Sequence, residues 1–411
     1  MRAAARVAAA ALVATFILVA AQGAAADDHA PPVSRETVQR AIDGAAWYLM
    51  RATRLDGSFE YRVNPNPAVT VKPRYNMLRH AGSIYAMTMY LAEQENAAVE
   101  DAALQAARYL MNRTVEHVAE EEAEDLLAVW SSPELTNSKK PVQAKLGGAG
   151  LGLVALAGLE DVRPGFTRME DLRALGRFIL FMQKPDGSFY SKYIPSTGGG
   201  DDSWTSLYYP GEAALGLLML FELDPDRVWL DAAGGALEFL ALSRAGQNDV
   251  PADHWALLAT AKLLALAGDR IDAERRARLI AHAVQICTAI LEQQIVGPGY
   301  GPVEGSFNPQ GRVTPTATRL EGLLAARTFL PDGSDLARDV DAAVARGIAF
   351  LLRAQIVEGH LAGGFPRAIA PLPDAAPKAD SFNRRATEVR IDYVQHALSA
   401  LIQYRAAVRF R

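Results

Sequence analysis

The sequence has a single cysteine, no excess of basic residues and, after residue 26, no long hydrophobic run. Cys287 alone excludes an internal disulfide and any cysteine-rich zinc site. It falls in an apolar helical run (283–291), so we predict a buried structural thiol. The formal net charge is −5 at pH 7. A chain with a negative net charge does not have the basic surface that nucleic acids require, so we expect no nucleic-acid partner.

The first 26 residues have the anatomy of a secretory signal peptide. Arg2 and Arg6 precede an apolar run, and three alanines (24–26) stand before two acids. The run is too short for a comfortable membrane span, although an uncleaved N-terminal anchor is the alternative. Residues 1–26 carry two arginines and no acid, so cleavage takes the charge from −5 to −7. We predict export to the periplasm or the medium, with no stable membrane span after cleavage.

The rest of the chain is predicted to be helical, because apolar residues recur at helical spacing and no segment alternates convincingly as a strand would. The helices form pairs. The first of each pair is charged on one side, whereas the second is nearly apolar all round, as in 146–153, and such a helix is buried. Six buried helices ringed by six half-exposed ones predict an all-α (α/α)6 barrel, or toroid, as a single domain over 27–411. The predicted pairs are 35–53 with 77–94, 99–113 with 142–159, 169–183 with 211–223, 228–244 with 252–267, 273–294 with 316–328, and 336–355 with 388–405.

A short turn recurs between the members of a pair. Residues 183–189 read Gln-Lys-Pro-Asp-Gly-Ser-Phe, and shorter versions occur at 55–59, 304–307 and 363–366. Asp-Gly makes a tight turn, and the aromatic residue after it can pin the turn to the core. The motif resembles the Q-x-x-D-G-S-W/F turn of squalene-hopene cyclases, prenyltransferases and other α/α-toroid proteins, including six-hairpin polysaccharide-active enzymes. The resemblance implies the toroid fold over most of the chain and leaves the reaction type open.

Motifs that would mark a terpenoid enzyme are missing. The sequence has neither the D-x-D-D motif of class II cyclases nor the D-D-x-x-D motif of class I synthases. The Asp/Cys/His zinc site of protein prenyltransferases has no counterpart, since Cys287 falls on a predicted outer helix. These departures weaken the terpenoid interpretation.

Candidate functional residues stand at the starts of the predicted inner helices, because the loops there converge on one mouth of such a barrel. The densest stretch, 201–213, brings two acids, Trp, two Tyr and Glu212 to one helix N-terminus, where Pro210 suits the first turn. Polar and aromatic residues at five of the six starts predict a pocket for a sugar or another polar ligand, anionic ones included. The catalytic candidates are His80, Asp202, Glu212, Glu321, Asp392 and His396, and the substrate-binding candidates are Tyr75, Asn76, Arg79, Trp204, Tyr208, Tyr209, His254, Trp255, Arg319 and Arg390.

Each catalytic candidate has a structural alternative. Thr318 and Glu321 fit a capping box. Glu212 lies in a first helical turn, where the helix dipole favours an acid and lowers its pKa, which suits a base or nucleophile. Asp392 and His396 are four residues apart on one helix face, so Asp392 could orient the imidazole, in catalysis or as a satisfied core pair. His80 could be structural, and the aromatic candidates could be sugar platforms or rim packing.

Three further expectations complete the prediction. No spacing such as H-E-x-x-H supports a metal, so we expect neither a metal nor a cofactor. The acidic run at 120–125 is predicted to be a solvated insertion. The segment 371–385 precedes the last inner helix and is interpreted as a surface loop or as a lid over the mouth.

Together these features predict an exported carbohydrate-active enzyme with a polysaccharide or oligosaccharide ligand. A hydrolase would pair Glu212 with Glu321, or Asp202 with Asp392, across the scissile bond. A lyase or epimerase would use Tyr or His to move a proton, with an arginine such as Arg79, Arg319 or Arg390 holding a sugar carboxylate. A terpenoid-cyclase-like protein and a non-catalytic toroid that binds a glycan or a partner protein remain as alternatives.

Overall fold

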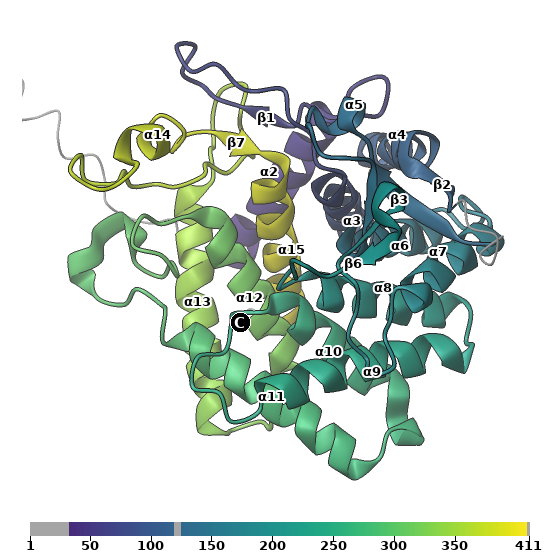
Figure 1. Cartoon of the computed structure of the whole chain (residues 1–411). Helices are drawn as coiled ribbons and strands as arrows, with labels where there is room; N and C mark the ends of the chain where they lie inside the picture. Colours follow the sequence, from purple (N-terminus) through teal and green to yellow (C-terminus); the bar gives the residue numbers. More distant parts are fainter. Residues whose placement is uncertain (1–32, 119–124, 409–411) are drawn as a thin grey trace, which may run out of the picture. The chain divides into compact units, whose positions relative to one another are not determined.

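The computed structural model describes residues 33–118 and 125–408, and in this part of the chain twelve long helices follow one another (Figure 1). The predicted signal peptide and residues 120–124 of the acidic run lie outside the described residues. The predicted fold class, all-α with six helical pairs, is confirmed. The pairs are α2 (Arg35–Ala52) with α3 (Met77–Glu93), α4 (Ala97–Thr114) with α6 (Leu146–Val162), α7 (Met169–Phe181) with α8 (Tyr209–Leu223), α9 (Arg227–Arg244) with α10 (His254–Ala267), α11 (Ala273–Leu291) with α12 (Val313–Arg327), and α13 (Asp335–Ala354) with α15 (Ile391–Ala407).

The second members of the pairs form a closed inner ring. Helices α3, α6, α8, α10, α12 and α15 each pack against the next, and α15 packs against α3. Small residues allow the closest of these approaches. A Cβ atom on Gly150 of α6 would lie 2.6 Å from the backbone carbon of Glu212 on α8. Every residue from Leu146 to Leu159 is buried, as expected for a helix that is apolar all round.

The recurring turn fastens an outer helix to the next one at the four places where it occurs. Gln183 donates a side-chain hydrogen bond to Ala232 O of α9 at 2.9 Å, and Gln355 donates one to Ala41 O of α2 at 2.8 Å, so the last outer helix is tied to the first. The turn glycines have positive φ and press against the neighbouring helix. A Cβ atom on Gly187 would lie 2.5 Å from Gly235 O. A side chain there would be both strained and obstructed, which explains why glycine recurs at this place.

The expectation that the chain has no strands is wrong. A five-stranded antiparallel sheet runs in the order β2-β3-β4-β5-β6, and a two-stranded one joins β1 to β7. The strands have two to five residues each, too short for an alternating pattern to show in the sequence. Segment 142–145, predicted to be helical, is mostly strand β4. The strands are β1 (Arg62–Val63), β2 (Val115–His117), β3 (Leu127–Ser131), β4 (Gln143–Lys145), β5 (Lys192–Ile194), β6 (Gly199–Asp201) and β7 (Val389–Arg390).

These strands lie in the loops that lead into the inner helices. β4 runs directly into α6, and β7 runs directly into α15. The segments that carry β1, β7, α5 (Pro133–Thr136) and α14 (Ala379–Asn383) lie at one end of the view in Figure 1. None of the helices in the described ranges is both long and apolar enough to cross a membrane.

Candidate functional site

A cavity of about 490 Å³ opens among the N-terminal ends of the inner helices, and all six of them contribute lining residues. Its size is in the range of small-ligand sites. The structure thus brings together most of the predicted site residues. Those that line the cavity are Asn76, Arg79, Tyr208, Tyr209, Glu212, His254, Trp255, Arg390, Asp392 and His396.

Two histidines and a glutamate form a cluster at this cavity. His396 Nδ1 of α15 lies 2.8 Å from Glu321 Oε2 of α12. His254 Nε2 of α10 lies 4.0 Å from the same oxygen, and the two imidazole rings are 5.5 Å apart in a T-shaped arrangement. The capping box predicted for Glu321 is therefore wrong, because α12 begins at Val313 and the Thr318 hydroxyl donates to Thr314 O instead.

His396 Nδ1 has a second neighbour besides Glu321. Gln395 Nε2 lies 3.2 Å from it, and which ring nitrogen carries the proton depends on the tautomer. Burial raises the pKa of Glu321 despite the opposing effect of His396. Glu321 and His396 are thus joined by a hydrogen bond along which a proton can pass.

His254 is the third member of the cluster. Its side chain is buried, and neither ring nitrogen has a hydrogen-bond partner. Burial lowers the pKa of His254 well below its ordinary value, and His396 and Arg319 lower it further. A neutral imidazole with a free nitrogen is a base. The cavity thus has an imidazole without hydrogen bonds beside the hydrogen-bonded pair of Glu321 and His396.

Glu212 stands on the first turn of α8 with its Oε2 atom buried and unpartnered. Burial raises the pKa of Glu212 well above its ordinary value, and nearby Asp253 raises it further. The expectation that the helix N-terminus lowers this pKa is wrong, because the loss of hydration outweighs the helix dipole. The Glu212 carboxyl therefore holds its proton more tightly than an exposed glutamate does.

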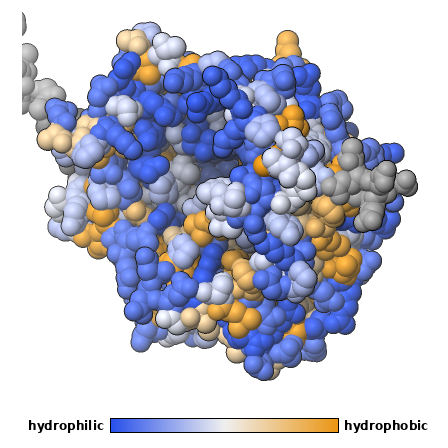
Figure 2. Space-filling model, viewed as in Figure 1, coloured by the Kyte–Doolittle hydropathy of each residue, from blue (hydrophilic) through white to orange (hydrophobic). Residues whose placement is uncertain are grey.

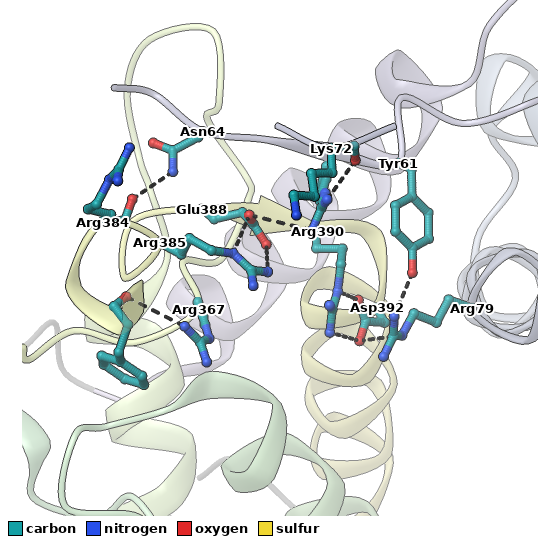
Figure 3. A network of polar contacts seen from close by, with 12 residues as sticks. Tyr61, Asn64, Lys72, Arg79, Arg367, Arg384, Arg385, Glu388, Arg390 and Asp392 are labelled. Carbon is teal, nitrogen blue, oxygen red and sulfur yellow. Dashed lines mark hydrogen bonds and ion pairs between the residues drawn. The ribbon is translucent and has the colours of Figure 1, made fainter. Parts of the chain in front are cut away.

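Asp392 is an ionised carboxylate held between two arginines (Figure 3). Arg390 binds both its oxygens, with Nη2 at 2.9 Å from Oδ2, and Arg79 Nε lies 3.1 Å from Oδ2. Burial alone would raise the pKa of Asp392, but the two guanidinium groups hold it below its ordinary value. The predicted pairing of Asp392 with His396 is not formed as a hydrogen bond, because these arginines occupy the carboxylate. Arg79 also donates to the Tyr61 hydroxyl at 2.6 Å.

Further polar atoms at the cavity have no partner within the described chain. They include Arg312 Nε and Thr314 Oγ1, both buried. Buried polar groups are normally paired, so these atoms and those of His254 and Glu212 are left for a ligand to satisfy. The sequence analysis did not include Arg312, Thr314 or Gln395 among its candidates. Their only sequence signal is their position close to the start of an inner helix.

His80 and Tyr75 lie outside this cavity and form a structural relay. The Phe59 N–H donates to the Tyr75 hydroxyl at 2.8 Å, that hydroxyl donates to His80 Nδ1 at 2.8 Å, and His80 Nε2 donates to Ala106 O at 2.8 Å. Burial lowers the pKa of His80 to about 4. The imidazole is neutral and fully bonded, so it ties the first turn and α3 to α4 and does not face the cavity.

Four other candidates are also absent from the cavity lining, and one of them, Glu321, meets the cavity through its hydrogen bond to His396. Asp202 is paired with Lys184 and its side chain is 44% exposed. Trp204 is 52% exposed and packs edge-on against Tyr209. Arg319 donates to Gln293 Oε1 and Pro315 O, each at 3.0 Å. The pairing of Asp202 with Asp392 across a substrate is therefore not supported by their positions.

His254, Glu321 and His396 also have the composition of a metal site. One ligand atom from each lies within 4.8 Å of the others, and this is the only such group of three or more in the described ranges. Two imidazoles and a carboxylate suit zinc or non-haem iron. The Glu321–His396 hydrogen bond already satisfies two of the three groups, so a metal would have to displace it. The expectation of no metal and no cofactor stays a prediction.

Comparison with known proteins identifies the fold. No protein-family model and no curated protein matches the sequence. Solved structures match over almost the whole chain. Cellobiose 2-epimerase from Bacillus thermoamylovorans is 12% identical with a TM-score of 0.65, covering 91% of this chain and 99% of that one. A sugar epimerase from a ruminal bacterium is 10% identical with a TM-score of 0.66, covering 91% and 100%.

An α-1,6-mannanase from Salegentibacter, solved in complex with α-1,6-mannotetrose, is 10% identical with a TM-score of 0.59 and covers 90% and 99%. The fold is therefore the α/α toroid of six-hairpin glycosidase-like proteins, as the recurring turn predicted. At these identities the likeness establishes the fold, and the chemistry has to be argued from the residues of this chain.

Proposed function

We propose that this protein is an exported carbohydrate-active enzyme of the epimerase or isomerase type, which moves a proton at a sugar carbon next to a carbonyl group. The observation that carries the proposal is the pairing of a neutral, unpartnered His254 with a His396 that is oriented by Glu321, side by side at one cavity. Export follows from the predicted signal peptide. The known neighbours that act as epimerases support the reaction type at the level of the fold.

The reaction balances on the residues of the chain alone. His254 takes the proton from the carbon, and the electron pair of that C–H bond becomes the double bond of an enediolate. Glu212 or an arginine stabilises the oxygen on which negative charge develops. His396 donates a proton from Nε2 to the carbon while the protonated Glu321 carboxyl passes its own proton to Nδ1, so the imidazole stays neutral and Glu321 becomes the carboxylate. Return of the proton to the opposite face of the same carbon inverts it. Return to the neighbouring carbon isomerises the sugar, provided that a proton also moves from the hydroxyl group of the first carbon to the former carbonyl oxygen, so that the two groups exchange places.

A hydrolase is the second candidate, because the cavity contains two carboxyl groups whose pKa values are shifted in opposite directions. The pKa of Glu212 is raised and the pKa of Asp392 is lowered. This is the pattern of a general acid and a general base. The two arginines on Asp392 argue against it, because they reduce its basicity and occupy its oxygens.

Exchange with deuterium distinguishes the two reactions. The purified protein is incubated in D₂O with cellobiose, mannose and uronic-acid oligosaccharides, and proton NMR follows the hydrogen next to the reducing-end carbonyl. We expect this signal to disappear, and to do so at least about 10²-fold more slowly in His254→Gln and His396→Gln. Release of new reducing ends without incorporation of deuterium would overturn the proposal in favour of the hydrolase.

A further inference from the structure

A second and larger cavity, of about 960 Å³, adjoins the central one. Its walls are the start of β1, the start of α3 with the residues just before it, the segment from the end of β3 through α5 to β4, and the residues around β7. Eight of its seventeen lining residues are lysine or arginine, and none is aspartate or glutamate. We call it the basic cavity.

Only half of these cations are neutralised. Asp392 pairs with Arg79 and Arg390, and Glu388 pairs with Arg62 and Arg385 (Figure 3). Within the described ranges, the remaining four cations have no carboxylate within 4.0 Å. They are Arg74, Lys139, Lys140 and Lys145.

Lys145 shows how strongly this charge is concentrated. Its side chain is half-buried at the junction of β4 and α6, and no acid approaches it within the described ranges. Burial lowers the pKa of Lys145, and the cations Lys140, Lys192 and Arg79 lower it further. The repulsion between these cations raises the free energy of the empty cavity. An anion that enters lowers it, because charge-assisted hydrogen bonds to the anion offset the repulsion.

The sign of the charge is opposite to that of the whole chain, which is −5 at pH 7. A positive cavity on a negative protein is therefore a local feature. Low-dielectric walls of one sign focus the field and draw oppositely charged ligands. The face of the molecule in Figure 2 is hollowed near its centre and is largely hydrophilic over the region that Figure 1 labels β1, β7 and α5.

The basic cavity and the central cavity share three lining residues, Asn76, Arg79 and Arg390. The two cavities therefore meet at these residues. Arg79 and Arg390 stand at this boundary with Asp392 between them. A ligand that occupies both cavities would have its charged units in the first and its reacting unit in the second.

We infer that the basic cavity is a subsite for the oxyanion groups of a glycan, carboxylate or sulfate, and that the substrate is an anionic glycan. This inference rests on the proposed function for the reaction, although the binding it describes can be measured without turnover. A neutral glycan would leave the four unpaired cations without a partner.

The test is calorimetric binding to the full protein carrying His396→Gln, so that no ligand is turned over. Three probes of equal length are compared: an oligogalacturonate, a sulfated galacto-oligosaccharide without carboxylates, and a neutral cello-oligosaccharide. We expect at least one anionic probe to bind about 10-fold more tightly than the neutral one at low salt, and its advantage to shrink between about 0.05 and 0.5 M NaCl. Preference for the uronate or for the sulfated probe identifies which oxyanion is recognised.

Variants locate the binding. Lys145→Gln and the double variant Lys139→Gln/Lys140→Gln are each expected to weaken the anionic probe about 3- to 10-fold and to leave the neutral probe unchanged. Lys262→Gln is the matched control, because that lysine pairs with Glu222 at 2.6 Å and lines neither cavity. Equal affinity for all three probes, or an equal loss in Lys262→Gln, would overturn the inference.

Failure of this inference is distinguishable from failure of the proposed function. Tight binding of an anionic probe without deuterium exchange in the protein with His396 intact would keep the subsite and reject the reaction. Exchange on neutral sugars, together with no preference for anionic probes, would keep the reaction and reject the subsite.

Discussion

His396 Nδ1 lies 2.8 Å from Glu321 Oε2, although the two residues are 75 positions apart in the sequence and stand on different inner helices. Both side chains are largely removed from water, with exposures of 12% and 1%. One proton shared between two such groups fixes the orientation of the imidazole and sets which of its nitrogens carries hydrogen. The consequences can be tested residue by residue.

The first prediction concerns Glu321 as the residue that positions His396. Glu321→Gln keeps the shape but removes the titrating carboxyl, so the imidazole loses the partner that compensates its charge. We expect the rate of deuterium exchange to fall by about 10²- to 10³-fold with little change in KM. The pH profile of kcat should also shift, which a merely structural role would not produce.

A double variant gives the control for this prediction. If Glu321 acts through His396, Glu321→Gln combined with His396→Gln should be no slower than His396→Gln alone, because residues that act as a unit are not additive. Glu222→Gln, at an exposed ion pair with Lys262, should leave the rate unchanged. Losses that simply multiply in the double variant would contradict the assignment.

The second prediction is a pH dependence of stability that comes from Glu212. Its pKa is raised above 4.5 in the folded chain, so above that pH the folded state keeps a proton that the unfolded state has lost. Stability from this group is therefore complete below about pH 4.5 and is lost as the pH rises toward the folded pKa. Glu212→Gln removes this titration, so the variant should gain stability relative to the parent as the pH rises from 5 to 8. Urea unfolding across this range measures the difference, and a constant difference would contradict the prediction.

A third prediction separates His80 from the active histidines. His80→Phe fills the space but leaves the Tyr75 hydroxyl and Ala106 O without their partner, which should cost about 2–3 kcal/mol of unfolding free energy. Exchange activity measured well below Tm should be unchanged. His117→Phe, at an exposed position of β2, is the control and should affect neither. Loss of activity without loss of stability would place His80 in the catalytic machinery after all.

The sequence was sufficient to predict the ring of helices and the place of the cavity. Periodicity separates buried from half-exposed helices, and Gly187 with Gln183 marks a turn whose geometry is local. Glu212 was found because Pro210 marks a helix start. These signals lie within a few residues of one another, so no knowledge of distant contacts was needed.

The partners within the cavity could not be predicted in the same way. Asp392 and His396 share a helix face, but each binds a residue of another helix. Arg79 pairs with Asp392, and Glu321 is hydrogen-bonded to His396. Burial, which reverses the pKa shift expected for Glu212, is also set by packing between helices. The register of the inner helices decides these contacts, and no motif in the sequence encodes that register.

A fourth prediction uses the tight contact between α6 and α8. A Cβ atom on Gly147 would lie 2.1 Å from Glu212 Oε2 and 2.4 Å from the Tyr209 ring. Gly147→Ala must therefore displace the Glu212 carboxyl, and we expect both a loss of about 1–3 kcal/mol in unfolding free energy and a reduced exchange rate. The matched control is Gly148→Ala, whose Cβ would meet Val129 O at an ordinary 3.5 Å. It should be neutral or slightly stabilising, since alanine favours the helix, and equal effects of the two variants would contradict the prediction.

The last prediction decides whether the cluster of His254, Glu321 and His396 works as a proton relay or as a metal site, because its donor set suits both. If the cluster is a proton relay, a metal ion competes with the proton that Glu321 and His396 share. The metal also binds the nitrogen lone pair that His254 needs as a base. We therefore expect EDTA to leave deuterium exchange unchanged and added Zn²⁺ to inhibit it, with weaker inhibition at lower pH, where protons compete for the same nitrogens. His254→Gln should weaken zinc binding measured by calorimetry, whereas His117→Gln should not. Loss of exchange in EDTA with recovery on adding a divalent metal would show instead that the three residues are ligands, and would reject the acid–base roles assigned to them.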